Sequence, residues 1–148
     1  MIFCDTSTAA KLYVSEAQST AVRNVLEAED AVCVSALVSE LFRVELTAIF
    51  HRRLSVGKWS PADFRAAVRQ FSHDDIAGFW TWLPLDRAIV EGAARTFMTL
   101  PSTVFLRSSD CLHLVTALHH KFSEVHTHDI HQVAAAAVLG LKPIAINP

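Results

Sequence analysis

Short apolar runs alternate with longer amphipathic stretches along the chain. The short runs are rich in β-branched and aromatic residues and predict strands at 2–4, 31–35, 80–85, 124–127 and 143–146. The stretches between them predict helices at 6–14, 20–29, 37–54, 60–75, 86–100, 110–120 and 130–139. Because strands that alternate with helices form parallel sheets, the pattern predicts one α/β domain over 1–148. We expect a central, mostly parallel sheet of four to five short strands with helices on both faces.

Capping residues support these boundaries. The segment 60–63, Ser-Pro-Ala-Asp, combines a cap, a proline at the first helical position and an acid in the first turn. Gly140 is placed to end the last helix, and Pro84 puts the strand at 80–85 at a sheet edge. Other expected helix caps are Thr6 or Ser7, Asp86, and Ser108 or Ser109.

Composition is that of a folded domain without a membrane span. Hydrophobic residues make up 51% of the 148 positions, charged residues 19%, and mean hydropathy is +0.30. No apolar run reaches the roughly 18 residues of a membrane helix, and the start MIFCDTS does not resemble a signal peptide. We therefore expect a cytoplasmic protein. Cys4, Cys33 and Cys111 show no CxxC spacing and are expected to be buried, reduced thiols.

Basic residues gather between Arg43 and Lys58, although the net charge of the chain is only −2. They are either a solvated helical face or an arm that faces phosphates. The residues considered as RNA-phosphate contacts are Arg43, Arg52, Arg53 and Lys58.

Three acids are expected at the edge of the sheet where the carboxyl ends of its strands lie, which is where open parallel sheets bind ligands. Asp5 ends the first strand, Asp110 opens a helix, and Asp129 follows the strand that ends at Thr127. Each could simply cap a helix. Asp5 is the hardest to explain in that way, because a carboxylate at the end of the buried run Ile-Phe-Cys needs a partner, and a cation is the natural one.

A fourth acid is expected from the helix at 37–54, which carries Glu40 and Glu45. Residues five apart lie on different helical faces, so only one of the two can readily look into a shared cleft. Local sequence does not choose between them.

Clustered carboxylates without a thiolate nucleophile or a glycine-rich phosphate loop indicate a hard cation, Mg²⁺ or Mn²⁺. The reaction that such a site supports best is phosphodiester hydrolysis by metal-activated water. A zinc site among the histidines between His113 and His131 lacks a dedicated ligand spacing. An aspartate-nucleophile phosphatase would need a second aspartate two residues after Asp5, where Ser7 stands.

Four segments resemble the PIN domain, and specifically the VapC toxins of prokaryotic toxin–antitoxin pairs. They are IFCDTSTAAKLYV, SELFRVELTAIFHRRLSVGKWS, LRSSDCLHLVTAL and VHTHDIHQVAAAAVLGLKPI. They cover nearly the whole chain in the family's order. Any one segment is weakly specific, whereas four in order are strongly so.

The resemblance implies a metal-dependent endoribonuclease, often dimeric, that a cognate antitoxin neutralises by filling the active-site cleft. The family's glutamate belongs to a Val-Glu pair about a dozen residues before a glycine, which matches Glu45 before Gly57. The gap between the preceding strand and Glu45 is longer here than in the family, which keeps Glu40 as a minor alternative. The metal-binding and catalytic set is then Asp5, Glu45, Asp110 and Asp129. Residues expected to support it are Thr6, Ser7, Thr127 and His113. A non-catalytic RNA- or protein-binding PIN domain is the alternative function.

Overall fold

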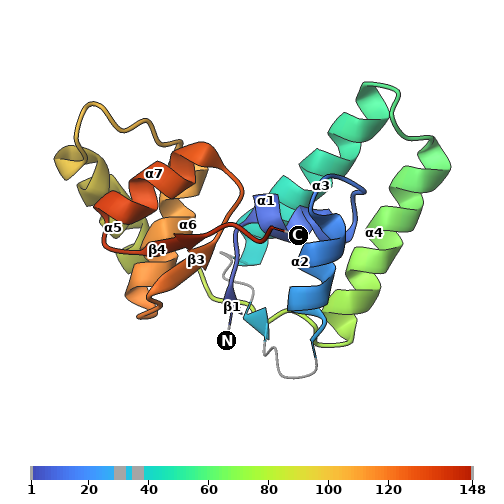
Figure 1. Cartoon of the computed structure of the whole chain (residues 1–148), viewed down its shortest axis with the longest axis horizontal. Helices are drawn as coiled ribbons and strands as arrows, with labels where there is room; N and C mark the ends of the chain where they lie inside the picture. The colour runs from blue at the N-terminus through green and yellow to red at the C-terminus, as the bar shows by residue number, and fades with distance from the viewer. Residues whose placement is uncertain (1, 29–32, 35–38, 148) are drawn as a thin grey trace.

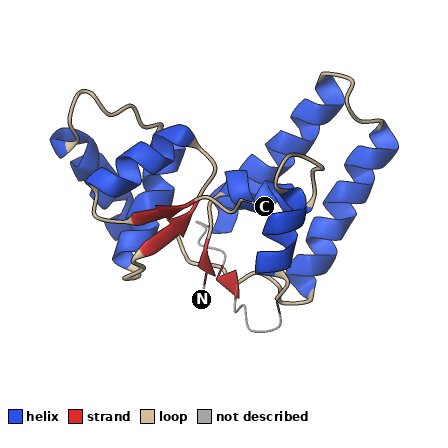
Figure 2. Ribbon diagram, in the orientation of Figure 1, coloured by secondary structure: helices blue, strands red, loops and turns tan. Residues whose placement is uncertain are grey.

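The computed structural model describes residues 2–28, 33–34 and 39–147. In these residues the strands are β1 (Ile2–Phe3), β2 (Cys33–Val34), β3 (Glu124–His126) and β4 (Lys142–Ile144). The helices are α1 (Thr6–Ala9), the 3-10 turn η1 (Ala10–Leu12), α2 (Ser19–Leu26), α3 (Ser39–Ser55), α4 (Pro61–Ile76), α5 (Arg87–Thr99), α6 (Ser108–His119) and α7 (Ile130–Val138). Helices therefore dominate the fold, and the strands are short (Figure 2).

The strands form two parallel pairs. β1 pairs with β2 through Ile2–Cys33 and Phe3–Val34, and β3 pairs with β4 from Glu124–Lys142 to His126–Ile144. A single parallel bridge between Cys4 and His126 connects the pairs, and the Asp5 amide donates to the His126 carbonyl at 3.0 Å. The parallel strand direction was predicted correctly. In the described residues the four strands form two pairs joined by this bridge, so a single sheet of four to five strands is not shown.

β1 lies between two groups of helices (Figure 1). On one side, α6 and α7 pack against β3 and β4, and α5 packs against α6. On the other side lie α1, α2 and the hairpin of α3 and α4. The carboxyl end of β1 thus leads directly into the junction of the two groups.

An aromatic cluster holds the helical hairpin together. Phe42 of α3 makes edge contacts with Phe71 of α4, at 5.7 Å between ring centroids, and with Trp80, at 5.4 Å. The indole N–H of Trp80 donates to the Tyr13 hydroxyl, and that of Trp82 donates to Asp75. The prediction of an edge strand at 80–85 was wrong: apart from one bridge residue at Leu83, the segment is a loop. The aromatic side chains of this segment pack against the helical hairpin, since Trp80 and Trp82 both contact Phe42 of α3.

Several predicted helix ends are confirmed. Ser60 and Asp63 form a reciprocal capping box with Pro61 in the first turn, and Asp86 caps α5 by accepting from the Ile89 amide. Gly140, after α7, has φ +83°, a conformation that favours glycine.

Two predicted caps were wrong. Asp5, rather than Thr6 or Ser7, caps α1, because its carboxylate accepts from the Thr8 amide. α6 begins at Ser108 with Arg107 at the cap position and no side-chain cap, so Asp110 lies inside the first turn rather than opening the helix.

Cys4 and Cys111 are buried, as expected; the side chain of Cys33 lies outside the described residues. Burial raises the pKa of the Cys111 thiol to about 11, which keeps it protonated and unreactive near neutral pH. Across the described part of the chain, no helix combines the length and the apolar character that crossing a membrane requires.

Candidate active site

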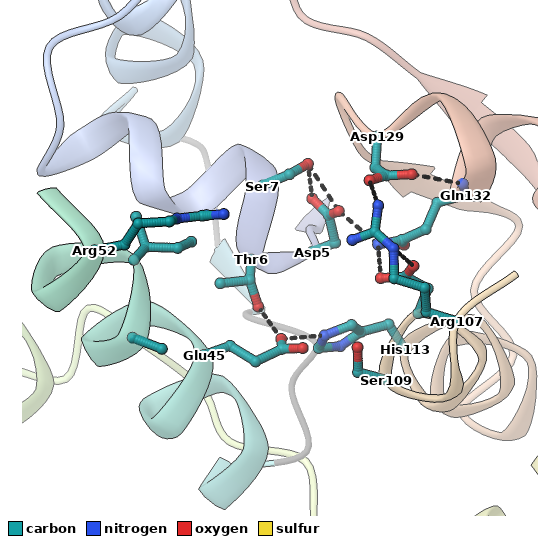
Figure 3. A pocket seen from close by; sticks show the side chains of 13 residues that line it. Asp5, Thr6, Ser7, Glu45, Arg52, Arg107, Ser109, His113, Asp129 and Gln132 are labelled. Carbon is teal, nitrogen blue, oxygen red and sulfur yellow. Dashed lines mark hydrogen bonds and ion pairs between the residues drawn. The ribbon is translucent and has the colours of Figure 1, made fainter. Parts of the chain in front are cut away.

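A cavity of about 450 Å³ lies where the two groups of helices meet. Its wall contains all four acids of the predicted set, Asp5, Glu45, Asp110 and Asp129. Each comes from a different part of the fold: the end of β1, the middle of α3, the first turn of α6 and the cap of α7. Further lining residues include Thr6, Ser7, Arg52, Arg107, Ser109, His113 and Gln132 (Figure 3).

Asp5 is completely buried and surrounded by hydrogen-bond donors. Its carboxylate accepts from the Ser7 hydroxyl and the Thr8 amide, at 2.8 and 2.9 Å. It also accepts from the Thr127 hydroxyl and from the Gln132 amide, both at 2.8 Å. These donors come from both groups of helices, so the hydrogen bonds of Asp5 connect the two groups. Asp5 also lines the cavity.

Asp129 caps α7 and faces the same cavity. Its Oδ1 accepts from the backbone amides of His131 and Gln132, at 2.8 and 3.2 Å. Its backbone amide donates to the Thr127 hydroxyl at 3.1 Å, so Thr127 connects Asp129 with Asp5. The capping and cavity-lining interpretations of the aspartates are therefore compatible, because capping leaves part of each carboxylate facing the cavity.

Asp110 and Asp129 lie on either side of Arg107. Arg107 Nη2 is 3.3 Å from Asp129 Oδ2, and its Nε is 3.7 Å from Asp110 Oδ2. Burial raises the pKa of the Asp110 carboxyl, and the negative charge of Asp129 raises it further, while Arg107 opposes both effects. A site that raises a carboxyl pKa in this way disfavours its own negative charge and is stabilised by a bound cation.

Glu45 reaches the cavity from the opposite side (Figure 3). The Thr6 hydroxyl donates to its Oε2 at 2.6 Å, and His113 Nε2 lies 2.8 Å from the same oxygen. Burial alone would raise the pKa of Glu45, but the hydrogen bond and attraction of His113, with the bond from Thr6, hold it below the usual value. Glu45 is thus favoured as a carboxylate. Glu40 lies in the first turn of α3, and its side chain is outside the described residues.

Gln132 occupies the space between two of the acids. The side chain is 2% exposed, and its Nε2 lies 2.8 Å from Asp5 Oδ2 and 3.2 Å from Asp110 Oδ1. Its Oε1 is buried without a hydrogen-bond partner among the described residues. The same is true of Asp110 Oδ2.

The basic residues of α3 divide into two groups. Arg43 pairs with Asp75 at 2.7 Å and lies over the Trp82 ring, while Arg53 forms an ion pair with Glu16. Arg52 is exposed and lines both the acidic cavity and a neighbouring hollow of about 310 Å³. That hollow is also lined by Glu16, Ile49, Arg53, Val56 and Lys58. Arg52 is therefore the basic residue of α3 that lies at the cavity itself.

The donor chemistry of the cavity fits a hard divalent cation. The candidate ligands are carboxylate and amide oxygens, which suit Mg²⁺ and Mn²⁺. The buried Asp110 Oδ2, which accepts no hydrogen bond from a described residue, is an oxygen atom that such a cation would satisfy. As they stand, no three His, Cys, Asp or Glu side chains among the described residues are close enough to hold a metal ion. The Gln132 amide and the Arg107 guanidinium lie between the carboxylates instead.

Sequence reasoning missed Gln132 and Arg107. Each lies one helical turn from a predicted acid: Gln132 three residues after Asp129, and Arg107 three residues before Asp110. The available signal was the position of Gln132 three and four residues before Ala135 and Ala136, on the apolar face of α7, since a polar side chain on such a face needs a partner.

Residues 2–138 match the family model of the PIN domain, which is most of the chain. The chain belongs to the PIN-domain family, whose members are typically metal-dependent nucleases. A search of curated proteins gave no match.

Proposed function

We propose that this protein is a Mg²⁺- or Mn²⁺-dependent endoribonuclease and the toxin of a VapBC-type toxin–antitoxin pair. The observation that carries the nuclease assignment is that four acids from four elements, Asp5, Glu45, Asp110 and Asp129, line one cavity. The PIN-domain match and the oxygen-rich donor set support it. A bound divalent cation there would lower the pKa of a water molecule and neutralise charge on a phosphodiester.

The protein's own residues have separate roles in this proposal. Asp5 and Asp110 are the most buried carboxylates of the set and bind the cation. Asp129 and Glu45 add negative charge around it. Thr6 and His113 orient Glu45, while Ser7 and Thr127 orient Asp5. Arg52, at the rim, is placed to contact an RNA phosphate.

Chelation tests the nuclease proposal. Purified protein should cut RNA with Mg²⁺ or Mn²⁺, lose the activity in EDTA, and regain it when metal is added back. Full cleavage by the metal-free protein would contradict the metal site. RNA binding that is unchanged by EDTA, without cleavage under any condition, would favour a non-catalytic binding domain.

The toxin role and the partners rest on the resemblance of the four segments to VapC toxins. We propose that the protein is cytoplasmic, that it forms a homodimer, and that a cognate antitoxin inhibits it. Val90, Ala94 and Phe97 form an exposed apolar stripe at helical spacing on α5, which supports the dimer. Expression should stop growth, and co-expression of the protein encoded by a short reading frame immediately upstream should restore it. Growth that is unaffected by the active nuclease would contradict the toxin role.

A further inference from the structure

We propose that Gln132 is a metal ligand. Before metal binds, its side-chain NH₂ group holds Asp5 and Asp110 together. When metal binds, its Oε1 turns to the cation. This inference rests on the metal site proposed above. It adds a neutral residue to that acidic set and explains why the four acids alone do not form a complete metal site as they stand.

The position of Gln132 follows from the start of α7. Asp129 caps the helix and accepts from the Gln132 backbone amide at 3.2 Å, so the backbone of Gln132 is fixed one turn into the helix. Side chains on a helix lean toward its N-terminus. The side chain of Gln132 therefore points back toward the cavity, which it lines, rather than along α7 (Figure 3).

The amide nitrogen bridges two carboxylates as a cation would. An NH₂ group has two donor hydrogens, and Nε2 has two acceptors, Asp5 Oδ2 at 2.8 Å and Asp110 Oδ1 at 3.2 Å. The partial positive charge of the NH₂ group separates two buried negative groups that would otherwise repel each other. The assignment of nitrogen and oxygen follows from this network, because an oxygen facing both carboxylates would be repelled by them.

The carbonyl oxygen of the Gln132 amide, Oε1, is the second observation that supports a ligand role. Oε1 of a side chain that is 2% exposed has no hydrogen-bond partner among the described residues. Buried polar atoms are almost always satisfied. The unpaired carbonyl oxygen of a residue that lines the acidic cavity is therefore an acceptor that a cation can satisfy. Rotation about the terminal torsion of glutamine has broad minima and exchanges the two ends of the amide. A cation between Asp5 and Asp110 reverses the local charge and thereby favours Oε1 in place of the NH₂ group.

The affinity for Mn²⁺ of chelator-stripped protein, measured by calorimetry, tests this role. We compare wild type with Gln132→Leu, which removes both ends of the amide, and Gln132→Glu, which keeps oxygen atoms. Gln70→Leu is the matched control, because Gln70 donates to Asp74 in the same way on the exposed side of α4. We expect Gln132→Leu to weaken Mn²⁺ binding about tenfold or more. We expect Gln132→Glu to bind at least as tightly as wild type and Gln70→Leu to be unchanged.

Wild-type or tighter Mn²⁺ binding by Gln132→Leu would overturn the ligand role, as would equal losses in the leucine and glutamate variants. Because the leucine variant could fold poorly, a second measurement uses wild type alone. The side-chain NH₂ signals of Gln132, assigned by their loss in Gln132→Glu, should shift on saturation with diamagnetic Mg²⁺ as they leave the carboxylates. Unmoved signals under saturating Mg²⁺ would also overturn the proposal.

Failure of this inference can be distinguished from failure of the nuclease proposal. Mn²⁺ binding that disappears in Asp5→Asn but is unaffected in Gln132→Leu leaves the acidic metal site in place and removes only Gln132 from it. Absence of Mn²⁺ binding in wild type would overturn both.

Discussion

Glu45 of α3 and His113 of α6, 68 residues apart in sequence, are joined by a contact of 2.8 Å between Oε2 and Nε2. The His113 side chain is 1% exposed, so its ring is fixed by packing and holds the Glu45 carboxylate in place. The Thr6 hydroxyl holds the same oxygen from α1. Three elements thus determine where Glu45 lies in the cavity.

The first prediction concerns the two glutamates of α3. Glu45→Gln should lose at least about 100-fold in RNA cleavage, because it removes a charge that faces the cation, and even indirect partners of a metal cost about 10–100-fold. Its fold should persist, since the amide oxygen still accepts from Thr6. Glu40→Gln should keep most of the activity. Single-turnover assays on folded, purified variants measure both.

The geometry of the helix makes this test decisive. Residues five apart point about 140° away from each other after the full turn is subtracted, so one cavity cannot receive both side chains. An inactive Glu40→Gln together with a normally active Glu45→Gln would mean that the glutamate of this helix has been misassigned and that the metal site must be redrawn.

The second prediction concerns Asp5→Asn. Activity should be abolished, because a carboxylate at the centre of the proposed metal site becomes neutral. Relief of charge repulsion among the clustered acids would, by itself, leave the fold intact or stabilise it. The structure favours the opposite result, because the carboxylate accepts from Ser7, Thr8, Thr127 and Gln132, and an asparagine NH₂ must face one of these donors. We expect a loss of about 1–3 kcal/mol in the free energy of unfolding.

Urea denaturation in EDTA measures this loss. Mg²⁺ should raise the Tm of wild type more than that of Asp5→Asn, since ligand binding stabilises only the protein that binds it. Greater stability of Asp5→Asn than of wild type in EDTA would show that charge repulsion outweighs the hydrogen bonds.

Local pattern was sufficient to place three of the four acids at one edge. Asp5 and Asp129 follow short strands, Asp110 stands near the start of a helix, and the carboxyl ends of parallel strands meet in space. Glu45 could not be chosen over Glu40 in this way, because both lie on one continuous helix, and only the family resemblance separated them.

Features that depend on distant segments were not predictable. The role of Gln132 depends on the distance between Asp5 and Asp110, which are 105 positions apart in the chain. The loop at 80–85 was misassigned for a related reason. Trp80 donates its N–H to Tyr13, 67 positions away, and both Trp80 and Trp82 pack on Phe42 of α3, contacts that no local window contains.

The third prediction tests the packing of α5 on α6. A Cβ added at Gly92 would lie 2.9 Å from Val115 Cγ1, which is closer than real Cβ atoms approach. Valine is stiff about χ1 and cannot easily move away. Gly92→Ala should therefore lose about 1–3 kcal/mol from overpacking, more than the roughly 0.5–1 kcal/mol that alanine gains over glycine in a helix. Thermal and urea unfolding measure the difference, and a variant more stable than wild type would show that the two helices separate freely.

The last prediction separates Arg52 from Arg53 as RNA contacts. The Arg53 guanidinium is already paired with Glu16, whereas Arg52 lines the acidic cavity and forms no ion pair with a described residue. Arg52→Gln should weaken RNA binding and reduce the slope of log affinity against log salt by about 1, because one fewer phosphate is neutralised. Arg53→Gln should change the slope much less.

The measurement is made over a range of salt concentrations in the Glu45→Gln background, so that the RNA stays intact. Equal slopes in the Glu45→Gln parent and in both arginine variants made from it would mean that this part of α3 is a solvated basic face. A larger change for Arg53→Gln would mean that RNA displaces Glu16, and the path of the phosphates would then follow the neighbouring hollow lined by Lys58.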